Sequence, residues 1–297
     1  MPHIHSIYRY PVKGLTPEPL PRIALSPGET LPGDRLYAIE NGPSGFDPIA
    51  PCYLSKTHFL MLMKNERLAS LRTAFDQESH TLTITPPSPH PGRASARPSA
   101  SLSGEGGREG MSAASTPAKI PPDPHPSPSP QGGEENVIRA NLRTADGRAA
   151  VEAFFAAYCA DELRGPPKIV HGGGHSFSDV AKKVVSFINL ASVAAIEDMV
   201  GAPVEPLRFR GNVYVEGWPA WSELELVGQT LTIGKARLKI VKRIVRCAAT
   251  NVDPSTGLRD LEIPPTLLRH LGHADCGIYA EVIDGGEIAP GDRIEIA

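Results

Sequence analysis

The sequence predicts a mixed, β-rich α+β fold that contains a β barrel. Short apolar and β-branched runs recur along the chain with Gly- and Pro-containing turns between them, and two segments have helical spacing with clear ends. One long Pro-, Ser- and Gly-rich stretch has almost no large apolar residues. Many short strands with glycine-rich connections favour a closed or partly closed barrel, because closure leaves no exposed sheet edges.

The N-terminal part is expected to consist mainly of strands. Turn signals at Ser26-Pro27-Gly28 and Pro32-Gly33-Asp34-Arg35 separate the predicted β segments. Residues 60–71 fit either a strand followed by a turn or a short helix. The strands predicted here cover residues 4–10, 19–25, 36–40 and 81–85.

Residues 86–135 differ sharply in composition from the rest of the chain. They are rich in Pro, Ser, Gly and Ala, so they cannot bury enough apolar surface to offset the entropy of ordering, and we predict that they are disordered. The segment is either a linker or an insertion. Insertion is favoured because residues 81–85 and 137–142 resemble two adjacent strands, and each doubling of loop length costs only about 0.6 kcal/mol. A Ser/Pro-rich binding segment is the functional alternative.

Two helices are predicted in the remaining sequence. Residues 149–163 have helical composition, with Cys159 in the core, and residues 190–200 follow Asn189 as N-cap and precede Gly201 as C-cap. The strands predicted here cover residues 168–171, 208–216, 224–226, 231–233, 236–245, 277–283 and 293–296.

Composition excludes several function classes. Thirty Lys and Arg against 33 Asp and Glu give a net charge of −3, so there is no global field for nucleic acid or an anionic membrane, and any anion site must be local. The four cysteines form no CxxC pair, which argues against a disulfide framework or a structural zinc module. The N-terminus lacks the pattern of a signal peptide, and no run of about 18 apolar residues occurs. We therefore expect a soluble, cytoplasmic protein with reduced thiols.

Several catalytic motifs fail on spacing. No Gly-x-Ser-x-Gly elbow accompanies His171-Gly172-Gly173-Gly174, so serine hydrolysis is not expected. The run from Gly228 to Lys235 has one residue too many for a P-loop and is predicted to be a hairpin. No Gly-x-Gly-x-x-Gly follows a strand, so a bound dinucleotide is not indicated.

The stretch 238–257 carries the most informative chemistry. It begins as a strand and ends with Cys247 beside Arg246, and adjacent cations favour the thiolate, which is both a nucleophile and a metal ligand. A lone cysteine after an apolar run is more commonly a small buried hydrophobe, so this segment alone leaves both interpretations open. Arg208 and Arg210 lie two apart on a predicted strand and would face the same side, where they would suit a phosphate or carboxylate, or simply be solvated.

These elements belong to an ordered set of motifs. The set comprises Pro11-Val12-Lys13-Gly14, Gly33-Asp34-Arg35-Leu36, His175-Ser176-Phe177-Ser178-Asp179, Arg208-Phe209-Arg210-Gly211-Asn212-Val213, Arg246-Cys247-Ala248-Ala249-Thr250-Asn251-Val252-Asp253-Pro254, and Gly277-Ile278-Tyr279-Ala280 with Gly291-Asp292. In this order the motifs resemble the MOSC family, whose members are similar to the C-terminal domain of molybdenum cofactor sulfurase. The layout is similar to that of the mitochondrial amidoxime reducing components and their bacterial relatives. The resemblance implies a smaller N-terminal β-barrel-like domain over residues 1–167 and a β-barrel MOSC domain over residues 168–297.

The resemblance also implies a cofactor and the residues that hold it. Cys247 matches the cysteine that ligates molybdenum directly, which suits a soft thiolate. Asp179 matches an acidic position near the metal and is assigned a catalytic, proton-handling or supporting role. The positions expected to bind the pterin and its phosphate are Lys13, Arg35, Ser176, Arg208, Arg210, Asn212, Arg246, Thr250 and Asn251.

The function implied is that of a molybdenum-cofactor oxidoreductase that reduces small N-hydroxylated compounds. Since no flavin, ferredoxin or NAD segment is present, the electrons are expected from a separate flavoprotein or ferredoxin-like partner. One alternative is a carrier that delivers the cofactor, or a persulfide on Cys247, to another enzyme. A further alternative is pyridoxal phosphate binding, for which Lys13 is the candidate Schiff-base lysine.

Overall fold

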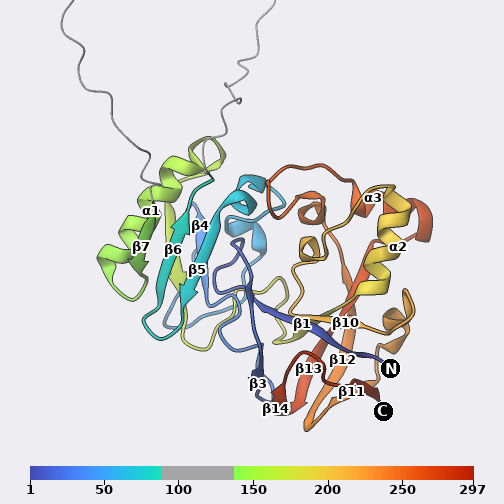
Figure 1. Cartoon of the computed structure of the whole chain (residues 1–297). Helices are drawn as coiled ribbons and strands as arrows, with labels where there is room; N and C mark the ends of the chain where they lie inside the picture. The colour runs from blue at the N-terminus through green and yellow to red at the C-terminus, as the bar shows by residue number, and fades with distance from the viewer. Residues whose placement is uncertain (88–136) are drawn as a thin grey trace, which may run out of the picture. The chain divides into compact units, whose positions relative to one another are not determined.

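The computed structural model describes residues 1–87 and 137–297 (Figure 1). From residue 88 on, the segment predicted to be disordered lies outside the described residues. Strands β6 (Thr81–Thr85) and β7 (Ile138–Asn141) on either side of it pair in antiparallel fashion, with Thr81 opposite Asn141. The predicted adjacency of these two strands is therefore confirmed, and the intervening residues join two neighbours in one sheet.

The largest element is an eight-stranded sheet with the order β15-β11-β12-β13-β9-β10-β1-β2. Its strands are β1 (His3–Arg9), β2 (Glu18–Pro19), β9 (Val185–Asn189), β10 (Val213–Glu216), β11 (Thr230–Ile233), β12 (Ala236–Val245), β13 (Asp275–Asp284) and β15 (Glu295–Ile296). The sheet curls so that its ends meet: the Ile4 amide donates to Asp292 and the Ile294 amide to Pro2, each at 2.9 Å. The two chain termini consequently lie close together (Figure 1). The predicted β-rich barrel is confirmed, and it includes the N-terminal strand β1.

The core of the barrel follows from the alternation of side chains along each strand. In β12 the inward residues Ala236, Leu238 and Ile240 are buried, whereas Arg237 and Lys239 between them are exposed. Inward residues of β1, β9, β10, β11 and β13 complete the same apolar cluster. Beyond Ile240 the alternation is interrupted by register shifts against β13, and β12 ends at Val245, directly before Arg246 and Cys247.

The N-terminal part packs around helix α1 (Ala145–Tyr158), which contacts β7 and β8 (Pro167–His171). A second apolar cluster fills this part, and it includes Phe155 of α1 and the fully buried Cys159 predicted for the core. The remaining strands of this part are β3 (Ile23–Leu25), which pairs with β14 (Gly286–Ile288), β4 (Tyr37–Asn41), which pairs with β8, and β5 (Arg72–Asp76), which pairs with β6. The helix begins four residues earlier than predicted because the Thr144 hydroxyl caps the Gly147 amide.

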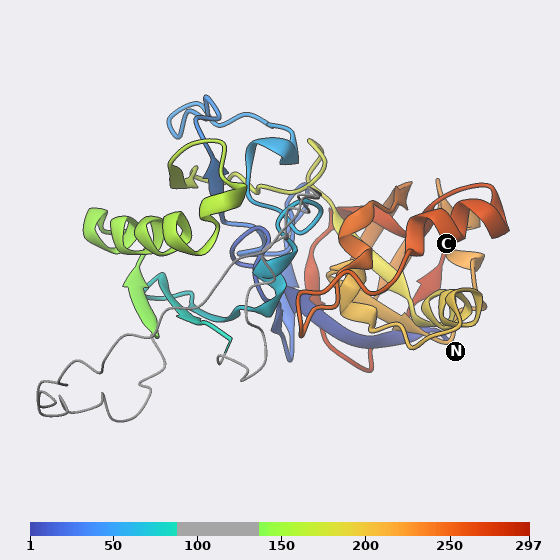
Figure 2. The same cartoon turned by 90° about the horizontal axis from the view of Figure 1, so that it is seen from above.

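Helices α2 (Leu190–Val200) and α3 (Ile263–Leu271) pack side by side against strands of the barrel (Figure 2). The predicted ends of α2 are confirmed: the Asn189 side chain accepts from the Ala191 amide, and Gly201 has a φ of 71°. Helix α3 was not predicted from the sequence; two prolines open it, which the first turn of a helix tolerates. No helix among the described residues has the length and apolarity needed to cross a membrane. A cytoplasmic location stays a prediction.

Three predicted strands differ in the structure. Residues 208–216 are not one strand: Pro206 opens the 3-10 helix η4 (Pro206–Phe209), and β10 starts only at Val213. Residues 224–226 lie in the 3-10 helix η5 (Ser222–Leu226). Residues 19–25 divide between the short strands β2 and β3, and residues 60–71 contain the 3-10 helix η2 (Glu66–Ser70). In each case the turn-forming residues determine the local backbone conformation, because the apolar run is too short to specify a strand.

Gly277 is required by the close pairing of β13 with β9. Its φ is +83°, and a Cβ there would lie 2.4 Å from the Phe187 backbone oxygen. We expect Gly277→Ala to lower the free energy of unfolding by about 2 kcal/mol or more, because left-handed backbone alone costs a non-glycine residue roughly 1–3 kcal/mol. Gly291→Ala is the control for urea unfolding, since its φ is +92° but open space surrounds its Cβ position. Equal losses in the two variants would contradict the close-contact explanation.

Candidate functional site

A cavity of about 360 Å³ opens where β12 ends, and it falls within the size range of small-molecule sites. Its lining includes the Cys247 thiol and side chains from both the N-terminal and C-terminal parts of the chain. Eight basic residues line it against two acidic ones; the basic residues are Lys13, Arg35, Lys56, Arg208, Arg210, Lys242, Arg243 and Arg246, and the acidic ones are Asp34 and Asp179. In a chain with a net charge of −3, the cavity is thus a local concentration of positive charge.

Cys247 is held at the cavity by the turn that follows β12. It is the N-cap residue of the 3-10 helix η6 (Ala248–Asn251), and its carbonyl accepts from both the amide and the hydroxyl of Thr250, each at 3.0 Å. Thr250 is itself buried. The side chain of Cys247 is partly exposed, unlike those of Cys159 and Cys276, for which burial raises the pKa to about 12. Cys247 is therefore the accessible thiol of the cavity.

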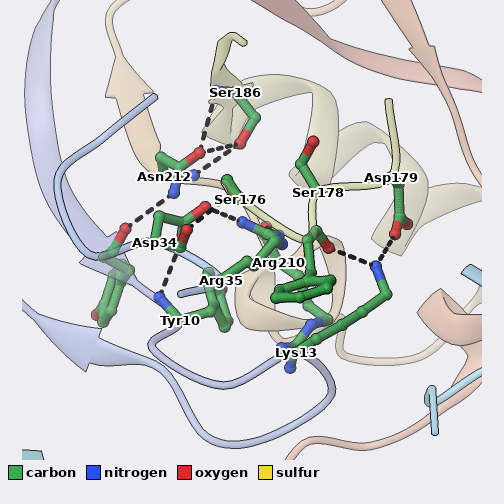
Figure 3. A network of polar contacts seen from close by, with 12 residues as sticks. Tyr10, Lys13, Asp34, Arg35, Ser176, Ser178, Asp179, Ser186, Arg210 and Asn212 are labelled. Carbon is green, nitrogen blue, oxygen red and sulfur yellow. Dashed lines mark hydrogen bonds and ion pairs between the residues drawn. The ribbon is translucent and has the colours of Figure 1, made fainter. Parts of the chain in front are cut away.

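A chain of alternating charges leads to this thiol. Lys13 is a buried residue, 5% exposed, and its ammonium donates to Asp179 Oδ1 at 2.5 Å (Figure 3). It also donates to the Phe177 carbonyl at 2.8 Å. Lys56 Nζ lies 3.6 Å from Asp179 Oδ2 and donates to Cys247 Sγ at 3.3 Å. The Asp179 carboxylate thus lies between two ammonium groups, and one of them contacts the sulfur.

This arrangement fixes the charge of each group. Burial opposes ionisation of Asp179, but Lys13 and Lys56 hold the pKa of its carboxyl well below its ordinary value. Burial lowers the pKa of Lys13, and Asp179 acts in the opposite direction. Burial also opposes the charge of Lys56, yet Asp179 and Cys247 raise the pKa of its ammonium. Asp179 is therefore ionised at neutral pH and accepts hydrogen bonds here. The same lowered pKa makes its carboxylate a weak base, so its contacts fit the predicted supporting role better than proton transfer.

Arg35 and Arg210 form a second cationic group next to the Tyr10 ring. Their guanidinium carbons lie 5.0 and 4.3 Å from its centroid, and Arg35 Nη2 donates to the Arg210 carbonyl at 3.2 Å. Arg35 also pairs with the buried Asp34, whose second oxygen accepts from the Tyr10 amide at 2.9 Å (Figure 3). Burial opposes the charge of Arg35, but Asp34 and Asp179 keep its pKa above its ordinary value. Both guanidinium groups are therefore charged and held in place at the cavity.

Arg208 is placed differently from the prediction. Because residues 206–209 form η4, Arg208 does not share a strand face with Arg210, whose φ of 51° turns the chain. The Arg208 side chain is 3% exposed and binds Asp260 through two contacts of 2.7 Å and Asp253 at 3.1 Å. The two most specific motifs therefore contact one another through Arg208 and Asp253. The structure gives Arg208 a role in joining η4 to the segment after Cys247.

The side chains of Asn212 and Arg246 likewise form hydrogen bonds with other parts of the chain. Asn212 Oδ1 accepts from the Ser186 hydroxyl at 2.8 Å (Figure 3). Asn212 Nδ2 donates to the Tyr8 carbonyl at 3.3 Å, so this buried amide, directly before β10, links β9 and β1. Arg246 donates through Nε to the Cys276 carbonyl at 2.7 Å and through Nη1 to the Phe209 carbonyl at 2.9 Å. Their contact with a cofactor stays a prediction.

The structure brings together most of the residues predicted for the site. The lining of the cavity includes Lys13, Arg35, Asp179, Arg208, Arg210, Asn212, Arg246, Cys247 and Thr250. Ser176 and Asn251 are not part of it. The Ser176 hydroxyl donates to the Asp34 carbonyl at 2.9 Å, and Asn251 Oδ1 accepts from the Ile263 amide at the start of α3. These two residues therefore stabilise loops next to the site.

Sequence reasoning missed other cavity residues. Lys56 begins the 3-10 helix η1 (Lys56–His58) and belongs to none of the motifs, so no sequence signal pointed to it. Lys242 Nζ lies 5.6 Å from the Tyr279 ring, and both residues line the cavity. Strict alternation would place Lys242 on the same side of β12 as Leu238 and Ile240, but a register shift between Ile240 and Lys242 interrupts the alternation, and the Lys242 side chain is exposed. Tyr279 was part of a motif, but neither residue was assigned a role. The cavity therefore contains three lysines, so Lys13 is one of three candidates for the Schiff-base lysine that pyridoxal phosphate would need.

Comparisons with known proteins agree with this picture. The family model described as MOSC N-terminal beta barrel domain matches residues 1–116, and the model described as MOSC domain matches residues 168–295. The chain therefore belongs to the MOSC family, in the arrangement with an N-terminal β-barrel domain. Both models together span most of the chain. The division at residue 167 stays a prediction.

Three solved structures with some similarity to the chain are bacterial proteins. The YuaD protein from Bacillus subtilis has 14% sequence identity and a TM-score of 0.40, with coverage of 100% of this chain and 96% of that chain. YiiM from Geobacillus stearothermophilus has 20% identity and YiiM from Escherichia coli 15%, each with a TM-score of 0.30 and coverage of 38% of this chain and 53% of that chain. No curated protein matches the chain. The family assignment rests on the two domain models.

Proposed function

We propose that this protein is a molybdenum-cofactor oxidoreductase that reduces small N-hydroxylated compounds. The observation that supports it most strongly is the accessible Cys247 thiol in a cavity lined by eight basic side chains. A separate flavoprotein or ferredoxin-like protein would deliver the electrons.

The donor set of the cavity fits this cofactor. A thiolate suits a soft metal, and guanidinium and ammonium groups suit the phosphate of the pterin. Cys247 would ligate the metal, and Arg35, Arg210 and Lys13 would hold the anionic parts of the cofactor. When bound, the cofactor supplies two-electron redox chemistry, and the reductive cleavage of an N–O bond to an amine and water consumes two electrons and two protons.

The chain's own residues provide binding and charge. Arg35 and Arg210, both in contact with the Tyr10 ring, present fixed positive charge at low entropic cost. Asp179 orients the ammonium groups of Lys13 and Lys56. The apolar side chains of Met61, Leu62 and Val184 line another part of the cavity, where they would exclude water and accept the uncharged portion of a substrate.

Turnover tests this function. The protein is purified from cells able and unable to make the cofactor, and each preparation is supplied with a chemical reductant and an aromatic amidoxime. We expect the amidine product only with protein from competent cells. Protein that carries the cofactor but gives no product would contradict the proposal, and transfer of the cofactor from it to an apo-enzyme would establish the carrier function instead.

A further inference from the structure

We propose that Lys56 is a positioning residue that holds the Cys247 sulfur toward the cavity and increases retention of the anionic cofactor. This inference rests on the proposed function and adds to it a residue that lies outside every motif of the sequence. It is carried by three observations: the contact of Lys56 with the sulfur, the way its turn is held, and the balance of charge around it.

The contact is direct. Lys56 Nζ donates to Cys247 Sγ at 3.3 Å and lies 3.6 Å from Asp179 Oδ2. Sulfur is a weak acceptor when it is neutral, whereas an ammonium next to a thiolate forms a charge-assisted hydrogen bond. Asp179 in turn prevents the flexible lysine side chain from turning away. Lys56 is therefore aimed at the one accessible thiol of the cavity.

The turn that carries Lys56 is tied to the loop that carries Asp179. The Ser55 hydroxyl accepts from the Thr57 amide at the start of η1, and the Phe59 amide donates to the Lys56 carbonyl at 3.1 Å. The buried rings of Phe59 and Phe177 pack edge to face with centroids 5.3 Å apart, and the Phe177 carbonyl accepts from Lys13. One packing contact thus fixes the two turns relative to one another.

A second contact holds the segment before η1. The Tyr53 hydroxyl donates to the Asp179 carbonyl at 3.2 Å. Segments 53–59 and 177–179 are therefore joined by a hydrogen bond, a ring contact and an ion pair. A lysine on a solvent-exposed turn would not be restrained in this way, because holding a surface lysine in one conformation costs side-chain entropy.

The charges explain why a lysine stands at this position. Lys13, Asp179 and Lys56 form a linear group with one carboxylate between two ammonium ions, so one positive charge remains uncompensated at the end that meets the sulfur. A metal-bound cysteine is a thiolate and supplies the missing negative charge.

The experiment compares Lys56→Met with Lys56→Arg and with the control Lys64→Met, an exposed lysine outside the cavity. Each full-length variant is purified from cofactor-competent cells, and molybdenum and pterin per chain are measured before and during dialysis. We expect Lys56→Met to lose the cofactor about ten-fold faster, as expected for the loss of a hydrogen bond to a charged group. Lys56→Arg should restore most of the retention, and Lys64→Met should match the wild type.

The outcomes separate this inference from the proposed function. Wild-type protein without molybdenum and pterin would overturn the proposed function, and this inference with it. Wild-type protein that carries the cofactor, with Lys56→Met retaining it equally long, would overturn the role of Lys56 alone. Thermal unfolding of the cofactor-free variants checks the fold: we expect equal midpoints, and a large drop for Lys56→Met that Lys56→Arg shares would assign Lys56 a structural role instead.

Discussion

Replacing Cys247 with alanine is expected to remove both the cofactor and the reductase activity while the barrel stays folded. The thiol is the metal ligand in the proposed function, and the backbone at this position is held by hydrogen bonds to the Cys247 carbonyl, which alanine retains. Activity should fall to that of protein made without the cofactor. Product formation from an aromatic amidoxime and metal analysis measure the two effects.

Cys52→Ala is the matched control, because Cys52 is an exposed thiol outside the cavity. It should keep wild-type activity and wild-type molybdenum content. Circular dichroism and thermal unfolding verify the fold of both variants. Activity that survives Cys247→Ala would refute the assignment of Cys247 as metal ligand.

The second large effect is expected for stability. Arg208→Met should lower the free energy of unfolding by about 1.5–3 kcal/mol, the range for a hydrogen bond to a charged group, because the partner carboxylates are partly exposed. Arg208 is almost fully buried and compensates Asp253 and Asp260 together, so both carboxylates would lose their cation. Burial opposes the ionisation of Asp253, but its hydrogen bonds lower the pKa of its carboxyl to about 2. Asp253 would therefore stay ionised at neutral pH.

Urea unfolding at neutral pH measures this loss against Arg237→Met. Arg237 forms a comparable pair with Asp284 at 3.1 Å, but both side chains are about half exposed. Solvent-exposed pairs contribute about 0–1 kcal/mol, so the control should change stability little. A loss no greater in Arg208→Met than in Arg237→Met would show that burial does not make the Arg208 pairs important.

The secondary-structure elements whose signals lie in the local sequence were predicted best. Strand β12 and helix α2 were predicted with their observed bounds, because alternation in the one and a cap at each end of the other are local signals. The pairing of β6 with β7 was also foreseen. Failures occurred where an apolar run contained or adjoined a proline or a tight turn, as at Pro206, where η4 replaces the expected start of a strand.

The site was predicted as a set of motifs, and its internal geometry was not. The order of the motifs brought Lys13, Asp179 and Cys247 into one hypothesis, and the structure places them around one cavity. The sequence could not show that the Arg208 side chain contacts two carboxylates, because the spacing of a strand implied that it faces the same side as Arg210. Nor could it reveal Lys56, which reaches the cavity only because η1 packs on the loop of Asp179.

The cofactor itself is the central claim, and its content in purified protein tests that claim most directly. Wild-type protein from competent cells, beside wild-type protein from cells unable to make the cofactor and Cys247→Ala from competent cells, is analysed for molybdenum and for pterin per chain. The account predicts molybdenum and pterin together, in similar amounts, only in the wild-type protein from competent cells. Wild-type protein from those cells with Cys247 intact and neither component present would contradict it.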